Sequence, residues 1–169
     1  MSQYLAYQGF SYQRAARPTR VLLTAFDVVV ALAVCMGIVM YHVRTGLTPM
    51  GGVAYYRGGG AGAEGPTALE LLDATHPHLF ATAFLLFVLG HLFALTRASD
   101  RAKTRLALLG FGAVVIDAAA PWIVRFVWAP FAAVQLANVA LMVAVIVVYL
   151  TVPLYEMWFA RASSPASPA

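Results

Sequence analysis

The sequence predicts an all-α membrane protein, a bundle of four transmembrane helices, and three observations lead to this fold class. Hydrophobic residues make up 62% of the 169 residues and charged residues only 11%, whereas soluble domains carry about 45–50% apolar and about 25% charged residues. Four apolar runs are each long enough for a helix to cross a bilayer. Runs of this length exceed ordinary strands, so we expect helices.

The four predicted spans form a single membrane domain over residues 21–153. They cover residues 21–42, 77–97, 105–127 and 130–152. Pro77 suits the first turn of the second helix, because the missing N–H has no partner there. Pro153 is expected to end the fourth helix.

Three connecting or terminal segments complete the predicted organisation. Residues 1–20 form an N-terminal segment, residues 154–169 a tail, and residues 43–76 the long loop. The middle of this loop is rich in glycine, so its backbone is costly to order unless something holds it. Its last part, 67–73, is predicted to form a short amphipathic turn on the membrane surface, with Thr67 as a candidate N-cap.

The distribution of Lys and Arg predicts the orientation of the spans. Eight basic residues precede span one, follow span four or join spans two and three; they are Arg14, Arg17, Arg20, Arg97, Arg101, Lys103, Arg105 and Arg161. The other side carries Arg44, Arg57 and Arg125. Both termini are therefore expected in the cytoplasm and the loop 43–76 outside. We expect this membrane to be a bacterial inner membrane. The high Ala, Val and Arg content suggests a GC-rich bacterial genome.

The same residue counts exclude several classes of function. The basic residues are too dispersed to follow the phosphates of a nucleic acid. One cysteine, Cys35, can form neither a disulfide framework nor a thiolate metal site.

Two pairs of polar residues are predicted inside the membrane, where an ionisable group suggests a functional site. Asp27 and His91 each lie about 9 Å from the cytoplasmic end of their spans, so they are expected to share a hydrogen bond. Such a pair would either exchange protons with a quinone or fix spans one and two together. Asp117 and Asn138 lie near mid-membrane and are expected to join spans three and four.

Three of the four histidines gather at the outer ends of the spans. His42 with His76 or His78 would supply two axial imidazoles to a b-type haem, and Arg125 would contact its propionates. An interfacial belt of polar and aromatic residues is one alternative interpretation. A copper or zinc site is another, with the candidate ligands Glu70, Asp73, His76 and His78.

Two segments resemble a known group of proteins. They are Thr75, His76, Pro77, His78, Leu79 and Phe80, followed by Gly90, His91, Leu92 and Phe93. Here the chain resembles small four-helix bacterial membrane proteins that accompany electron-transfer systems, and more loosely the b-type cytochrome membrane subunits. The resemblance covers spans one to three and the part of the loop from Thr48 to Gly58. It implies partners among the other membrane subunits of such a system.

Two hypotheses of function follow from these observations. In the first, the chain is a membrane electron-transfer subunit that binds one haem b near the outer face. It would pass electrons between the quinone pool and an outward-facing redox protein, at most as one subunit of an oxidoreductase complex. In the second, it is a cofactor-free accessory subunit that stabilises a larger respiratory or photosynthetic complex in the lipid bilayer.

Overall fold

The computed structural model describes residues 11–59 and 64–160. A short 3-10 turn, Tyr12–Arg14, precedes α1, which spans Arg17–Thr45. A nine-residue helix α2, Pro49–Arg57, leads to α3, Ala68–Ala94. Helix α4, Asp100–Trp122, continues into the π-helical turn η2, Ile123–Val127, and α5 spans Phe131–Trp158. Within these residues four helices are long and apolar enough to cross a membrane, which confirms the predicted fold class.

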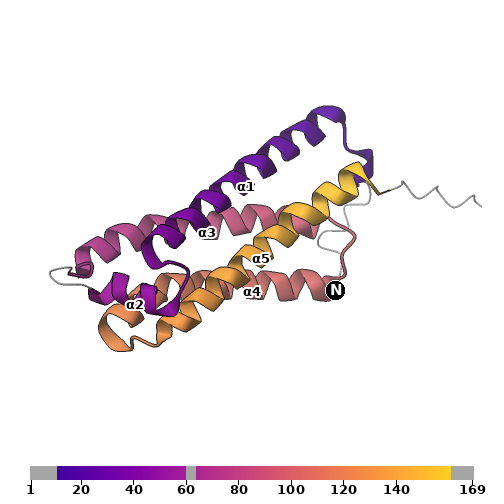
Figure 1. Ribbon diagram of the computed structural model, residues 1–169. Coiled ribbons are helices and arrows are strands. Elements are labelled where there is room, and N and C mark those ends of the chain that lie inside the picture. Colours follow the sequence, from indigo (N-terminus) through magenta and orange to yellow (C-terminus); the bar gives the residue numbers. More distant parts are fainter. Residues whose placement is uncertain (1–10, 60–63, 161–169) are drawn as a thin grey trace, which may run out of the picture.

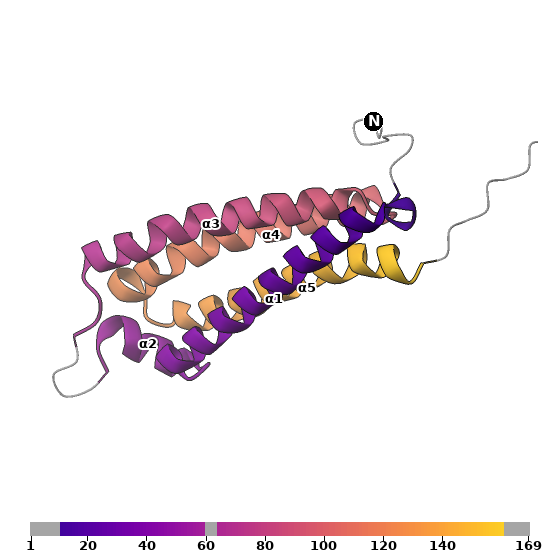
Figure 2. The ribbon, with the colours of Figure 1, turned by 90° about the horizontal axis from the view of Figure 1, so that it is seen from above.

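Three helices form the packed centre of the molecule. Helices α3, α4 and α5 contact one another, whereas α1 packs mainly against α2 and α5. Figure 1 shows α1 on the opposite side of the molecule from α4, and Figure 2 shows it crossing α5. Only 11% of the most apolar part of α1 is buried. Most of this helix therefore makes no contact with the rest of the described chain.

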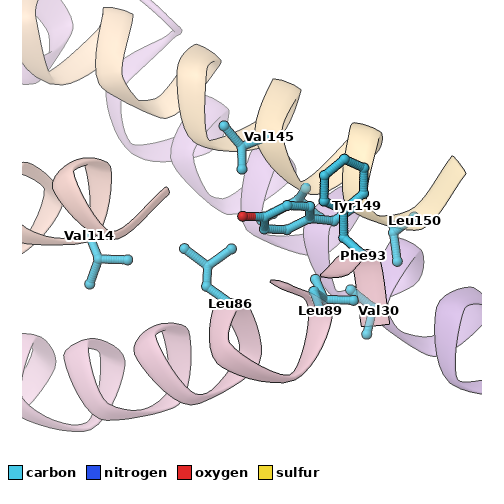
Figure 3. Packing of buried hydrophobic residues seen from close by; sticks show 9 residues of the cluster. Val30, Leu86, Leu89, Phe93, Val114, Val145, Tyr149 and Leu150 are labelled. Carbon is cyan, nitrogen blue, oxygen red and sulfur yellow. The ribbon is translucent and has the colours of Figure 1, made fainter. Parts of the chain in front are cut away.

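The hydrophobic core lies where α3 and α5 pack closely together. Its buried members are Val30, Leu86, Leu89, Phe93, Val114, Val145, Ile146, Tyr149 and Leu150 (Figure 3). The rings of Phe93 and Tyr149 lie 5.3 Å apart, and Leu89 is completely buried. Lipid tails are as apolar as these side chains, so tight packing rather than escape from water favours this core.

Helix α3 begins earlier than the predicted span at 77. Thr67 accepts a hydrogen bond from the Glu70 N–H, and the Glu70 carboxylate accepts one from the Thr67 N–H, which is a complete capping box. The predicted N-cap is therefore confirmed, but the helix that it starts runs on without a break. Pro77 consequently lies inside α3 rather than in its first turn.

The fourth span also extends beyond its predicted limit. Pro153 lies inside α5, which continues to Trp158. A proline removes one helical hydrogen bond without necessarily ending the helix when neighbouring elements hold the backbone. The tail predicted over 154–169 is thus helical in its first part, and 161–169 lies outside the described residues.

The glycine-rich loop contains an ordered helix, α2. Thr48 caps it by accepting a hydrogen bond from the Gly51 N–H, and Pro49 occupies its first turn. At its other end the Arg57 Nε donates to the Val124 carbonyl at 2.6 Å. These contacts supply the support that the loop was predicted to need.

Candidate functional site

A histidine and an aspartate meet between α3 and α4. The Nε2 atom of His78 lies 2.9 Å from Oδ2 of Asp117. The two side chains differ in exposure, since 60% of His78 is accessible and only 15% of Asp117. Because an ionised carboxylate can only accept, Nε2 carries the proton in this pair and Nδ1 is left to accept or donate.

The sequence of α4 explains why Asp117 faces α3. Buried residues recur along this helix at three- and four-residue spacing, at Gly110, Ala113, Ala120 and Val124. Asp117 lies on the same stripe, which faces the other helices of the bundle. The carboxylate is therefore held inside, while His78 lies at the accessible edge of α3.

Two buried amides form a second polar layer on α5. Gln135 donates from Nε2 to the Tyr56 hydroxyl at 3.1 Å, and Asn138 donates from Nδ2 to the Ala113 carbonyl at 2.9 Å. The carbonyl oxygens of both amides, Gln135 Oε1 and Asn138 Oδ1, are buried without a hydrogen-bond partner in the described structure. Asn138 thus joins spans three and four as predicted, but its partner is the Ala113 carbonyl, one turn before Asp117, and no hydrogen bond to Asp117 is present in the described residues.

The end of α4 closes the site on the side of α2. After Pro121 the helix widens into the π-turn η2, in which the Trp128 N–H reaches back to the Ile123 carbonyl. The Val124 carbonyl in this turn accepts the bond from Arg57, and Trp122 donates from Nε1 to the Thr75 hydroxyl at 3.3 Å. Helices α2, α3 and α4 are thus tied together around the His78–Asp117 pair.

The structure does not bring Asp27 and His91 together. His91 is exposed, and its ring lies 6.4 Å from that of Phe87 on the same helix. Asp27 is buried on α1. No hydrogen bond joins the two side chains in the part of the chain that the structure describes. The predicted Asp27–His91 hydrogen bond is therefore absent, since matching depth does not make two side chains face each other.

Asp27 instead lies near the N-terminal turn. The Tyr12 hydroxyl donates to the Leu92 carbonyl at 2.6 Å, and this side chain is almost fully buried. Burial raises the pKa of Tyr12, and the negative charges of Glu156 and Asp27 raise it further. The N-terminal turn therefore closes this end of the bundle, at the side opposite the His78–Asp117 pair.

The candidate haem and metal ligands are placed as follows. His42 and His76 are exposed, and the Arg125 side chain packs over Phe126 with its Nε buried and without a partner in the described residues. Glu70 is engaged in the capping box of α3. Among the described residues, no three His, Cys, Asp or Glu side chains form a group that could hold a metal ion.

The His78–Asp117 pair escaped the sequence-based prediction, although a signal for it exists. If Arg97 marks the middle of the turn between α3 and α4, His78 lies 97 − 78 = 19 residues before it and Asp117 lies 117 − 97 = 20 residues after it. In an antiparallel helix pair such residues lie at the same depth. The assumption that the helix begins at 77 placed His78 at the membrane surface and hid this match.

The fold and the site define a four-span helical membrane protein with a polar pair between its spans. Residues 46–164 match the family model of a transmembrane helical domain, Aq_1264_TM, and the chain belongs to this family. The matched region begins directly after α1 and includes α2 to α5. Searches of curated proteins and of solved structures found no match.

Proposed function

We propose that the chain is a membrane subunit of an electron-transfer complex in which His78 and Asp117 bind a quinone head group and exchange its protons. One observation carries this proposal: an accessible imidazole is hydrogen-bonded at 2.9 Å to a mostly covered carboxylate, between two membrane-spanning helices. The sequence suggested such a pair from Asp27 and His91, and the proposal assigns the same chemistry to His78 and Asp117.

The chemistry of this pair suits a quinol. Nδ1 of a neutral His78 accepts a hydrogen bond from a quinol hydroxyl and then its proton, while the Asp117 carboxylate stabilises the resulting imidazolium. Oxidation of a quinol to a quinone releases two protons and two electrons. In the proposed reaction one proton goes to His78 and the other to water, and both electrons go to a metal redox centre of a partner subunit.

Quinone binding to the full chain in lipid nanodiscs tests the proposal. Trp122 bonds to Thr75, one turn from His78, so quenching of its fluorescence reports a short-chain benzoquinone at the site. His78→Gln and Asp117→Asn each remove one hydrogen bond, so each should raise the Kd for the benzoquinone about tenfold. His91→Gln is the matched control, because it removes an exposed histidine from the same helix. If the unaltered protein and all three variants bind the benzoquinone with the same Kd, the quinone site is ruled out.

The haem b hypothesis stays a prediction, and one contact weighs against His78 as an iron ligand. Ligation of iron through Nε2 of His78 would break the bond to Asp117. His42 and His76 remain as the candidate ligand pair. A reduced-minus-oxidised visible spectrum of the same nanodiscs should then show a sharp α-band, and a flat spectrum would reject haem.

A second candidate function is a cofactor-free accessory subunit, and the exposure of α1 favours it. Large apolar side chains such as Leu32 and Met36 are 61% and 70% exposed along this helix. Such a surface fits against the helices of another membrane protein as well as against lipid. The quinone titration separates the two functions. An accessory subunit without a quinone site would show the same Kd for the benzoquinone in His78→Gln, Asp117→Asn and His91→Gln.

A further inference from the structure

An apolar groove lies between α1 and the end of α5, far from the His78–Asp117 pair. Its volume is about 480 Å³, and its lining residues are Val21, Thr24, Ala25, Val28, Val29 and Trp158. The polar atoms of the lining are already bonded: the Thr24 hydroxyl donates to the Arg20 carbonyl at 2.8 Å and accepts from Trp158 Nε1 at 3.1 Å. The groove therefore offers a hydrocarbon surface to its occupant.

Positive charge lies at one end of this groove. Arg17 precedes Val21, Thr24 and Val28 at helical spacing, so its Cβ lies on the same face of α1 as the groove. Arg20 is already engaged, since it donates to the carbonyls of Ala15 and Gln13 and packs over the Trp158 ring. The Arg17 side chain is exposed and makes no hydrogen bond within the described residues. Its guanidinium is thus available to a ligand at the mouth of the groove.

We propose that this groove binds one acyl chain of an anionic phospholipid, whose phosphate group contacts Arg17. An arginine donates paired hydrogen bonds to phosphate oxygens, and basic residues next to a span attract anionic head groups. Tryptophan, here Trp158, is typical of the level at which head groups and acyl chains meet. A zwitterionic lipid offers the same phosphate, but its ammonium group offsets the charge that Arg17 attracts.

Native mass spectrometry of the full chain tests this site by titration with phosphatidylglycerol and with phosphatidylcholine. The unaltered protein should prefer phosphatidylglycerol, and Arg17→Gln should raise the Kd for this lipid about tenfold, the effect of losing one charged hydrogen bond. Arg105→Gln is the matched control, since it removes the same charge from the exposed start of α4. Its Kd should stay within about twofold of the unaltered protein.

A second variant tests the groove itself. Ala25→Phe places a large ring in the groove while Arg17 is kept, so it should weaken phosphatidylglycerol binding at least as much as Arg17→Gln. Equal weakening by Arg17→Gln and Arg105→Gln would overturn the proposal in favour of general surface charge. Equal affinity of the unaltered protein for both lipids, or unchanged binding to Ala25→Phe, would overturn it as well. None of these results depends on the quinone site.

Discussion

At the scale of single residues, polar side chains that are buried or mostly covered have different kinds of partner in this bundle. Asp117 pairs with a histidine on the neighbouring helix, and Gln135 contacts the Tyr56 hydroxyl on α2. Asn138 bonds to the Ala113 carbonyl, a backbone group of the α4 helix. The bond of Asp117 thus joins α4 to α3, and the bond of Gln135 joins α5 to α2. The bond of Asn138 joins α5 to α4.

The Tyr56 contact predicts how α2 responds to alkaline pH. Burial raises the pKa of Tyr56 from 10.0 to about 12, although the hydrogen bond from Gln135 lowers it in part. A group whose pKa is higher in the folded state stabilises that state fully below its unfolded pKa. This contribution of Tyr56 is therefore complete below about pH 10 and disappears as the pH rises through 12. We expect α2 to detach over this range.

Amide hydrogen exchange of α2 as a function of pH measures this effect. Because the intrinsic exchange rate also rises with pH, protection factors relative to an unstructured peptide are the quantity to compare. Tyr56→Phe keeps the buried ring but has no proton to lose, so the alkaline loss of protection should be absent. If both proteins lose protection at the same pH, Tyr56 does not control the docking of α2.

At the scale of helices, α4 shows how small residues permit close packing. Gly110 is buried, and a Cβ built on it would lie 3.4 Å from Cγ1 of Val145 and 3.5 Å from Cδ1 of Leu86. Gly112, two residues further on, has no atom within 4 Å of the same position. One glycine thus meets α3 and α5, and the other faces away from the bundle.

These two glycines predict opposite effects of the same substitution. Gly110→Leu forces a large side chain between three packed helices and should lower the free energy of unfolding by about 1–3 kcal/mol. Gly112→Leu should leave it unchanged or raise it by up to about 1 kcal/mol, because leucine favours the helix. Unfolding by SDS in mixed micelles measures both variants. Similar losses in the two would contradict the packing described for α4.

At the scale of the whole molecule, the basic residues within the described ranges separate to the two ends of the bundle. Arg97 donates to Gln13 at the end that carries the N-terminal turn, while Arg57 and Arg125 lie at the end of α2 and η2. The grouping of charges used to predict the orientation is therefore consistent with the fold. Which end faces the cytoplasm stays a prediction from the positive-inside rule.

Labelling of single cysteines in whole cells tests this orientation. Two exposed residues, Ala54 and Thr104, are each replaced by cysteine in a protein from which the native thiol has been removed by Cys35→Ser. Ala54→Cys on α2 should react with a membrane-impermeant thiol reagent added from outside. Thr104→Cys near the start of α4 should react only after the membrane is permeabilised. The reverse pattern would place both termini outside.

The sequence by itself determined the fold class and the number of spans. Lipid offers no hydrogen bonds to the backbone, so an apolar run of about 20 residues has the helix as its stable form. Local signals also predicted the N-cap Thr67 correctly, because a capping box involves only residues of one turn.

Only the tertiary structure decided which polar residues meet. Depth follows from residue number, but the direction in which a side chain points depends on how its helix is rotated against its neighbours. His78 and Asp117 face each other because α3 and α4 are antiparallel neighbours, whereas His91 turns to the exposed side of the same α3. Apolar spans of this kind carry little amphipathic pattern, so packing between helices, rather than local sequence, sets that rotation.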